Sequence, residues 1–342
     1  MSERILIIGA GFAGMWSALG AMRLLDQQGK ADGSVEVAVI APQSELHIRP
    51  RLYEKKASTM KAPLSEIFAN AGVRFIKGYA TAVSTARNSV TYSDEEGRET
   101  TVSYSKLVLA TGSVLFRPDI PGLAHAFNVD QLADAAVLEE HISELGHLPE
   151  SRSRNTVVVA GGGFTGIETA AEMPHRLRAA LGKDADVRVV IVERNDAIGP
   201  DLGPGPRPVI EQAFAELGVE TRLGEGIIAI DPEGVTLESG ERINAATVVW
   251  TAGARANPIT KQIDGEKDAF GRLHVDRNLK VIGHSNVYAT GDVAYAATDD
   301  QGNRTMMSCQ HAQNLGRSAG HNVAADLLGV DPIPYSQEKY VT

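Results

Sequence analysis

A glycine pattern occurs twice in the chain, each time between a short apolar run and a helix-like stretch. Residues 4–8 (RILII) lead into GAGFAG at 9–14, and residues 156–160 (TVVVA) lead into GGGFTG at 161–166. A lone glycine pattern is a weak signal, but a strand before it and a helix after it mark the opening of a Rossmann βαβ unit. The chain is therefore expected to contain two such units.

The repeat continues beyond the glycines at a constant distance of 152 residues, the distance from Gly9 to Gly161. VEVAVIAP begins at Val35 and VRVVIVER begins at Val187, which is again 152 residues. Each copy thus spans a complete βαβ crossover, and we do not attribute this to chance.

The three glycines of each pattern have distinct steric roles. The first permits a tight turn, the second lets a pyrophosphate approach the backbone, and the third allows the helix to pack closely. Unpaired N–H groups and the positive end of the helix dipole then hold the phosphates. One dinucleotide is therefore expected at each pattern, at Gly9, Gly11 and Gly14 in the first copy and at Gly161, Gly163 and Gly166 in the second.

Short strand-like segments follow each crossover and predict a small β flap in each half. Each half then ends in a strand followed by Thr-Gly or Ala-Gly, in LVLATGS and VVWTAGA. A further strand in NVYATGDVA and a helix from about 307 to 328 come last. The flap segments lie at 73–76, 80–83, 89–92 and 100–103 in the first half, and begin at 219, 226, 234 and 241 in the second.

The expected fold class is therefore α/β, with two Rossmann-like dinucleotide-binding units that each carry a three-stranded flap. A length of 342 residues suits about two domains. We expect a discontinuous first domain of residues 1–115 and 270–342 and a second domain of residues 116–269.

Charge and cysteine content exclude several classes of protein. A formal net charge of −10 without a dense basic run argues against nucleic-acid binding. The single cysteine, Cys309, excludes dithiol chemistry, and the nine histidines show no metal-ligand spacing, so no metal is expected. No apolar stretch approaches the ~18 residues of a membrane span, and no signal sequence is recognised, so we expect a cytoplasmic protein.

The motifs GAGFAG, LVLATGS, GGGFTGIETAAE, VVIVER, VVWTAGA and VYATGD occur in that order. In this the chain resembles, over about residues 4–328, the two-dinucleotide flavoproteins of the pyridine nucleotide-disulfide oxidoreductase superfamily. The resemblance implies FAD in the first unit, at Gly9, Gly11, Phe12, Ala13, Gly14, Ala41, Ala110, Thr111, Gly112, Gly291, Asp292, Gln310, His311 and Ala312. It implies NAD(P)H in the second unit, at Gly161, Gly163, Phe164, Thr165, Gly166, Glu193, Ala252 and Gly253.

The segments FTGIETAAEM and SCQHAQNLG look most like type II NADH dehydrogenases, which pass electrons from NADH through FAD to a quinone. The resemblance implies that Glu168 lies near the flavin and that Gln310 borders the quinone site, with Cys309 replacing the usual Ala. Two plainer explanations stay open. Glu168 is also explained as a first-turn acid stabilised by the helix dipole, and Gln310 and Gln313 as polar residues on a helix face.

The ends of the two second strands differ from each other. The repeat places Ala41 opposite Glu193, where a carboxylate normally accepts hydrogen bonds from the cofactor ribose. Either Gln43 or Ser44 takes this role in the first unit, or FAD is held without the contact. The charge of Glu193 should repel a 2′-phosphate and favour NADH over NADPH, although the neighbouring Arg194 leaves NADPH open.

The end of the sequence also departs from the family. Type II NADH dehydrogenases continue with a strand-rich segment and amphipathic helices that attach them to the membrane, whereas this sequence stops at KYVT, residues 339–342. The resemblance therefore suggests a shortened chain that keeps FAD and NADH binding. Such a chain would lose quinone specificity and expose apolar surface for a homodimer. Peripheral contact with the inner face of the cell membrane is expected to run through the missing segment.

The expected reaction is hydride transfer from NADH to FAD, followed by electron transfer to a quinone. Reductases that need a redox cysteine pair are excluded by the single cysteine. A reductase of a small electron-carrier protein such as ferredoxin or rubredoxin has the same two nucleotide folds and is the rival enzyme. A NADH-responsive signalling flavoprotein with little turnover is the alternative from a different class.

Overall fold

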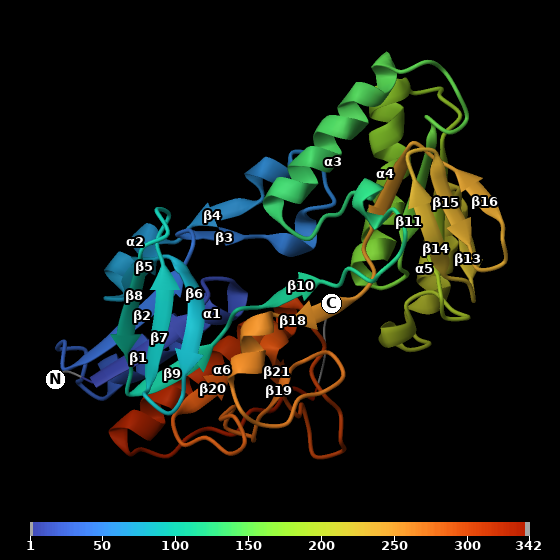
Figure 1. Cartoon of the computed structure of the whole chain (residues 1–342). Helices are drawn as coiled ribbons and strands as arrows, with labels where there is room; N and C mark the ends of the chain where they lie inside the picture. The colour runs from blue at the N-terminus through green and yellow to red at the C-terminus, as the bar shows by residue number, and fades with distance from the viewer. Residues whose placement is uncertain (1–2, 339–342) are drawn as a thin grey trace. The chain divides into compact units, whose positions relative to one another are not determined.

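The computed structural model describes residues 3–338, which form two compact units (Figure 1). The boundaries differ from the expected domain ranges, because residues 48–61 and 115 belong to unit 2 and residues 254–269 to unit 1. The motif KYVT lies outside the described residues. Within the described part, unit 1 contains residues 3–47, 62–114 and 254–338, and unit 2 contains residues 48–61 and 115–253.

Unit 1 is built on a parallel sheet of five strands in the order β20-β9-β1-β2-β5. Its central strand, β1, pairs with β2 from Glu3↔Val35 to Ile8↔Ile40 and with β9 on its other side. The apolar run in β1 is almost completely buried, as expected for a parallel strand that is covered on both faces. The strands are β1 (Glu3–Ile8), β2 (Val35–Ala41), β5 (Arg74–Lys77), β9 (Lys106–Leu109) and β20 (Val287–Ala289).

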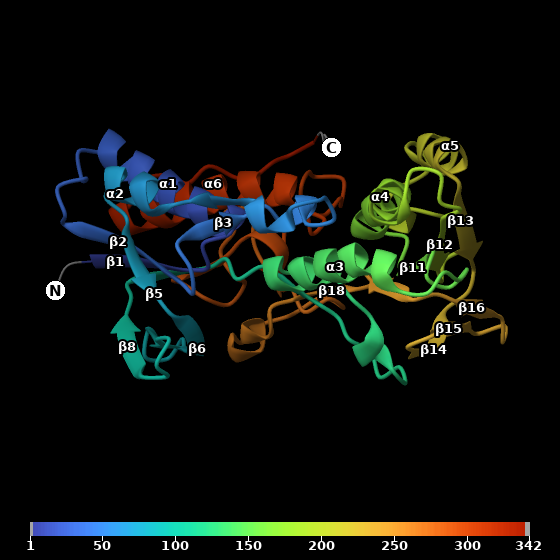
Figure 2. The ribbon, with the colours of Figure 1, turned by 90° about the horizontal axis from the view of Figure 1, so that it is seen from above.

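Two long helices, α1 (Phe12–Gln27) and α6 (Cys309–Leu328), lie side by side on one face of this sheet (Figure 2). A glycine allows the close contact, because a Cβ on Gly316 would lie 2.4 Å from the carbonyl oxygen of Ala13. The hydroxyl group of Ser17 also donates to the carbonyl oxygen of Gly316 at 3.1 Å. The start of α6 is thereby held against the start of α1.

The other side of the sheet carries a three-stranded antiparallel sheet in the order β6-β7-β8 (Figure 2). This confirms a flap of three strands, but segment 73–76 was wrongly expected in it. Its residues form β5, which pairs in parallel with β2 from Ala38↔Arg74 to Ala41↔Lys77, and a short apolar pattern does not distinguish these two placements. The elements are α2 (Ser65–Asn70), β6 (Tyr79–Ser84), β7 (Ser89–Ser93) and β8 (Glu99–Ser103).

Unit 2 repeats this plan with a parallel sheet of four strands in the order β13-β12-β11-β17. Side chains of the central strand β11 alternate between two cores. Val157 and Val159 pack with the helices, while Val158 and Ala160 pack with the antiparallel sheet β14-β15-β16. Figure 2 shows this antiparallel sheet on the side of the parallel sheet opposite α4. The segment at 219 was expected in the flap but forms β13, because it pairs in parallel with β12.

From β11 to β17, the strands and helices of unit 2 follow the same βαβ, flap and strand order as those from β1 to β9 in unit 1. Its helices are α3 (Leu132–Glu144), α4 (Phe164–Leu181) and α5 (Arg207–Leu217). Its strands are β11 (Thr156–Ala160), β12 (Arg188–Glu193), β13 (Val219–Leu223), β14 (Ile227–Asp231), β15 (Gly234–Leu237), β16 (Arg242–Asn244) and β17 (Thr247–Trp250). Short two-stranded pairs elsewhere are β3 (Glu45–His47) with β4 (Lys61–Pro63), β10 (Ser113–Leu115) with β18 (Ala254–Ala256), and β19 (Leu273–His274) with β21 (Ala294–Tyr295).

One partly buried carboxylate ties α6 to the sheet of unit 1. Asp326 Oδ2 accepts hydrogen bonds from Lys106 Nζ at 2.6 Å, Tyr288 Oη at 2.8 Å and Lys280 Nζ at 3.0 Å. Burial by itself would raise the pKa of Asp326, but these three donors outweigh burial and hold the pKa below its usual value. The ionised form of Asp326 therefore stabilises the fold.

We expect Asp326→Asn to lower the free energy of unfolding by about 1–2 kcal/mol at pH 7, the scale of charged hydrogen bonds that are partly screened. Because the folded-state pKa is lowered, this stabilisation is present above the unfolded pKa of about 4 and is lost as the pH falls through the folded value. Chemical denaturation should show that the difference in free energy of unfolding between wild type and Asp326→Asn becomes smaller from pH 7 towards pH 3. The exposed Asp331→Asn is the control, and equal losses in both variants would contradict the assignment.

Candidate functional site

The two glycine turns have the same backbone geometry, one in each unit. Gly9 has a φ of 106° and Gly161 a φ of 108°, in a region that side chains disfavour. The N–H of this glycine donates at 2.8 Å to the carbonyl oxygen near the end of the second strand, of Ile40 in unit 1 and of Val192 in unit 2. The repeat read from the sequence is thus confirmed in three dimensions.

The second and third glycines of each turn have opposite surroundings. A Cβ on Gly11 or Gly163 would meet no protein atom within 4 Å, so both positions leave space beside the helix start. A Cβ on Gly14 or Gly166 would lie 1.9 or 1.8 Å from the carbonyl oxygen of the first glycine of its turn. The third glycine thus holds the helix against the turn, and the second leaves room for a pyrophosphate. The first helical turns contribute Phe12 and Ala13 in α1, and Phe164 and Thr165 in α4.

Segments from three other elements of unit 1 meet at its glycine turn. A Cβ on Gly9 would lie 2.3 Å from the carbonyl oxygen of Ala110, which follows β9. A Cβ on Gly291, which follows β20, would lie 2.7 Å from the Cβ of Ala13 and 3.7 Å from that of Ala312 in α6. The carboxyl end of this sheet therefore gathers residues 9–14, 110–112, 291–292 and 310–312.

Two buried hydroxyl groups here have no hydrogen-bond partner among the described residues. They are Thr111 Oγ1 and Thr290 Oγ1, the second of which directly precedes Gly291. Asp292 accepts a hydrogen bond from Ser113 Oγ at 2.7 Å, which orients its carboxylate. Buried polar atoms are rarely left unsatisfied, so this set of groups suits a polar ligand such as a dinucleotide.

The start of α6 carries several polar side chains. Ser308 caps the helix by accepting a hydrogen bond from the N–H of His311 at 3.3 Å, and His311 Nδ1 accepts one from the N–H of Met306 at 3.2 Å. The thiol of Cys309 donates to Gln310 Oε1 at 3.1 Å, which orients the amide of Gln310. Burial lowers the pKa of His311, so its imidazole is neutral at pH 7.

Unit 2 builds its own site at the end of β12 and β17. A Cβ on Gly161 would lie 2.9 Å from the Cα of Ala252, and the next residue, Gly253, has a φ of 80°. Glu193, the last residue of β12, accepts a hydrogen bond from the N–H of Gly162 at 2.6 Å. The predicted residues of the second fingerprint therefore lie together in one unit.

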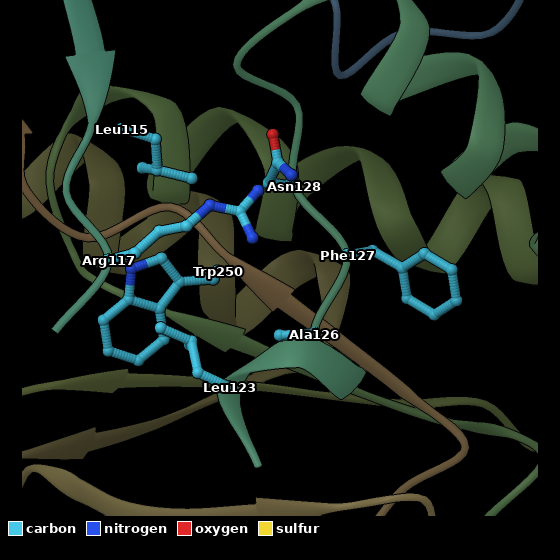
Figure 3. A pocket seen from close by; sticks show the side chains of 7 residues that line it. All are labelled: Leu115, Arg117, Leu123, Ala126, Phe127, Asn128 and Trp250. Atoms are coloured by element: carbon cyan, nitrogen blue, oxygen red, sulfur yellow. The ribbon is translucent and has the colours of Figure 1, made fainter. Parts of the chain in front are cut away.

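A small pocket in unit 2 lies beside the end of β17 (Figure 3). The indole of Trp250 donates to the carbonyl oxygens of Phe116, at 3.1 Å, and Ala252, at 3.0 Å. Figure 3 shows the Arg117 side chain over Trp250, with Asn128 next to it. Trp250 thus fixes the segment that closes against the glycine turn, and none of the predicted site residues lines the pocket.

The end of β2 has no counterpart to the carboxylate of unit 2. Ala41 is only 4% exposed. Of the two residues expected to replace a carboxylate, Ser44 accepts a hydrogen bond from Ser65 Oγ at 3.2 Å, while Gln43 is partly exposed. Gln43 is therefore the better candidate for a ribose contact in unit 1.

Segment 48–61 is anchored on unit 2 by both its backbone and its side chains. Arg176 Nη1 donates to the carbonyl oxygen of Tyr53 at 2.8 Å, and Glu139 of α3 accepts from the N–H of Lys56 at 2.7 Å. Leu52 is buried in the same core as α3 and α4. The segment is thus a fixed part of unit 2, although its flanking residues belong to unit 1.

Glu168 of α4 is electrostatically coupled to this segment. Arg51 binds both carboxylate oxygens of Glu54 at 2.6 Å, and this hydrogen bonding lowers the pKa of Glu54. Burial first, and then the charge of Glu54, raise the pKa of Glu168 to about 7. The helix dipole acts most strongly on the first turn of a helix, and Glu168 lies beyond the first turn of α4. The explanation of Glu168 as a first-turn acid therefore loses its basis.

The two predicted catalytic residues belong to different units, Glu168 to unit 2 and Gln310 to unit 1. Each is therefore positioned by its own unit. The sequence did not reveal Arg51 or Glu54, because segment 48–61 shows no apolar periodicity and the helices that it packs against lie far away in the chain.

Comparison with known proteins identifies the family. The family model described as pyridine nucleotide-disulphide oxidoreductase matches residues 3–316. The chain belongs to this family. It is an NAD(P)H-dependent flavoprotein oxidoreductase, which confirms the resemblance read from the sequence.

Relatives and solved structures agree with this assignment. The NADH dehydrogenase-like protein Rv1812c of Mycobacterium tuberculosis is 44% identical over 348 aligned positions, which cover 99% of this chain and 84% of the relative. The demethylphylloquinone reductase NdbB of Synechocystis sp. is 27% identical, with 97% and 81% covered. The structure of NDH2 from Plasmodium falciparum in complex with NADH has a TM-score of 0.79 at 16% identity, with 99% and 87% covered, and thus shares the fold.

No helix within residues 3–338 is long and apolar enough to cross a membrane. The same part of the chain contains no group of three or more His, Cys, Asp or Glu residues that could hold a metal ion.

We expect Glu168→Gln to stabilise the fold relative to wild type, increasingly so as the pH rises from 5 to 8. The folded-state pKa of about 7 lies above the ordinary value of 4.5, so stability is lost as the pH rises through this window. Glutamine does not ionise and avoids the loss. Thermal unfolding across this pH range tests the expectation, with Glu211→Gln on the exposed side of α5 as the control. A stability difference that does not vary with pH would refute it.

Proposed function

We propose that this protein oxidises NADH bound to unit 2, transfers the hydride to FAD held by unit 1, and passes the electrons to a quinone. The observation that carries this proposal is the pair of open glycine turns, of which only the turn in unit 2 has a carboxylate at the end of its second strand. Two sites with the same phosphate cradle and different ribose surroundings suit two different dinucleotides.

The residues of unit 1 fit FAD. Gly11 leaves room for a pyrophosphate at the start of α1, and Thr111 and Thr290 have buried hydroxyl groups that a polar ligand would satisfy. Asp292, oriented by Ser113, would accept hydrogen bonds from ligand hydroxyls. When bound, FAD would supply the chemistry of accepting a hydride and passing on electrons, so no side chain needs to be modified covalently.

The residues of unit 2 fit NADH. Gly163 leaves room for the pyrophosphate at the start of α4. Glu193 can accept hydrogen bonds from the adenosine ribose, and its negative charge disfavours a 2′-phosphate. Arg194 beside it is exposed, so discrimination against NADPH depends on how firmly the Glu193 carboxylate is held.

Glu168 of unit 2 and Gln310 of unit 1 each carry a group suited to quinone reduction. With a pKa of about 7, Glu168 can hold or deliver a proton near neutral pH. The oxygen of the Gln310 amide accepts from the Cys309 thiol, which leaves the amide N–H groups to donate to a quinone carbonyl. The two side chains thus offer a proton and a hydrogen-bond donor.

The names of the relatives support a quinone as the acceptor, since NdbB is a demethylphylloquinone reductase. A quinone with an apolar side chain favours a membrane over water, because its apolar surface is removed from water there. We therefore expect the working enzyme at the cytoplasmic surface of a membrane, in peripheral contact with it. We also predict that it forms a homodimer.

A small electron-carrier protein is the second candidate acceptor. Segment 48–61, which is coupled to Glu168, carries five Lys and Arg residues and one Glu in a chain of net charge −10. Arg49 pairs with Asp130 and Arg51 with Glu54, so the excess positive charge of the segment comes from its lysines. This charge on an acidic protein would steer an acidic carrier towards the segment.

Substitution of the second glycine in each turn should separate the two cofactors. We expect Gly11→Val to fold but to purify without FAD, because its side chain fills the space for the pyrophosphate. Gly163→Val should keep FAD but no longer be reduced by NADH. Flavin content after denaturation and anaerobic stopped-flow reduction measure these outcomes, and each variant is the control for the other. Full FAD content in Gly11→Val, or FMN in the wild type, would overturn the assignment.

Steady-state NADH oxidation against quinones, oxygen, ferredoxin and rubredoxin tests the acceptor. We expect a quinone to be the fastest acceptor. Gln310→Ala should raise the quinone KM by roughly three- to tenfold, the loss of one hydrogen bond, with little change in kcat, while Gln313→Ala should not. Glu168→Gln should slow quinone turnover and leave FAD bound.

The other outcomes of this panel identify the alternatives. Faster reduction of a carrier protein than of any quinone would favour the second candidate. Slow oxidation by every acceptor, together with a change of oligomeric state on reduction, would favour a signalling flavoprotein.

A further inference from the structure

The carboxylate of Glu193 is held in place by three hydrogen bonds from unit 2 itself. Its Oε2 accepts from the N–H of Gly162 at 2.6 Å, and its Oε1 accepts from the N–H of Asn195 at 2.9 Å. The side-chain amide of Asn195 donates to the same Oε1. A carboxylate has about four acceptor positions, so one remains for a ligand, and the orientation of the group is set before any nucleotide binds.

Gly162 makes this arrangement sterically feasible. A Cβ at this position would lie 3.0 Å from both Cβ and Cγ of Glu193, and 2.8 Å from Cδ1 of Ile198. The methylene groups of Glu193 thus pass directly over the bare backbone of the turn. Any side chain at position 162 would push the carboxylate away from the N–H to which it is bonded.

The internal repeat provides a control for this interpretation. At the repeat distance of 152 residues, Gly162, Glu193 and Asn195 correspond to Ala10, Ala41 and Gln43 of unit 1. Ala10 and Ala41 are both buried, with 6% and 4% exposed. Where the carboxylate is absent, the turn carries a methyl group and the residue two positions later is different. The three positions therefore change together between two turns of otherwise equal geometry.

We propose that Asn195 is a positioning residue for nucleotide selection in unit 2, where it acts with the N–H of Gly162 to aim the Glu193 carboxylate at the adenosine ribose. This rests on the proposed function in one respect, since it takes NADH to be the nucleotide of unit 2. A fixed carboxylate accepts a ribose hydroxyl at its remaining acceptor position and repels a 2′-phosphate. Without the amide of Asn195 the carboxylate can turn towards the exposed Arg194. This turn weakens both the hydrogen bonding to the ribose and the repulsion of a 2′-phosphate.

Asn195 is exposed, so its substitution should leave the core intact. With the FAD-loaded full chain, we expect Asn195→Ala to weaken NAD⁺ binding and to reduce the preference for NAD⁺ over NADP⁺ by roughly three- to tenfold, the effect of one hydrogen bond to a charged group. Asn195→Ser keeps a donor, although its hydroxyl lies one bond nearer the backbone, and should restore part of the preference. Asp196→Ala, at the neighbouring exposed position, is the matched control and should match the wild type.

Titration calorimetry with NAD⁺ and NADP⁺ measures this preference as a ratio of two Kd values, without turnover or an electron acceptor. Gly162→Ala should reduce the same ratio by displacing the carboxylate, and thermal unfolding shows whether that variant is folded. An unchanged ratio in Asn195→Ala would overturn the inference, as would an equal change in Asp196→Ala.

Failure of the proposed function has a different signature. If Gly163→Val left NAD⁺ binding intact, the nucleotide would not occupy unit 2, and the assignment of the two sites would fall whatever the ratio in Asn195→Ala. A quinone that failed to accept electrons would leave the Kd ratios, and the role of Asn195, unaffected.

Discussion

The contact between the third glycine of each turn and the carbonyl oxygen of the first positions the rest of both sites. This oxygen lies less than 2 Å from where a Cβ on Gly14 or Gly166 would stand, so neither position admits a side chain and each helix starts directly on its strand. In unit 1 the same closeness brings Ala13 against Gly291 and Gly316. The start of α6, with Gln310 and His311, therefore reaches the glycine turn only because α1 already lies flat on it.

Similar backbones in the two units carry different chemistry because the differences are confined to side chains at the strand ends. The turn of unit 2 is closed by a carboxylate that receives backbone and amide hydrogen bonds, and the turn of unit 1 is closed by two methyl groups. Two acidic side chains of unit 2 likewise differ in protonation because their neighbours differ. Glu54 stays ionised because Arg51 binds it, and Glu168 is driven towards its neutral form by burial and by the charge of Glu54.

Features governed by local sterics were predictable from the sequence. The glycine turns, the repeat distance and the start of α1 at Phe12 depend on residues close together in the chain, and the structure reproduces them. The placements of β5 and β13 were not predictable, because a four- or five-residue apolar strand looks the same at the edge of a parallel sheet and in a flap.

The candidate site follows the same division. Its glycines and Glu193 could be located from the pattern alone, whereas the coupling of Glu54 to Glu168 could not, since it depends on segment 48–61 folding onto helices encoded far downstream. The hydrogen bonds that hold the Glu193 carboxylate could be predicted only in part. The sequence repeat already shows that Gly162 stands where the first copy has Ala10. Only the three-dimensional structure shows that Asn195 donates hydrogen bonds to the carboxylate.

The division of the chain between the units has a consequence for the order of events during synthesis. The core of unit 2 includes Leu52, and its last strand, β17, ends at Trp250, so every residue of this core is synthesised before β20 and α6. Until then the sheet of unit 1 lacks an edge strand, and the face of α1 that receives Gly316 has no partner. The unit whose first strand is synthesised earliest is therefore the last to close, and a nascent chain must keep its apolar α1 surface from other contacts while unit 2 completes its fold.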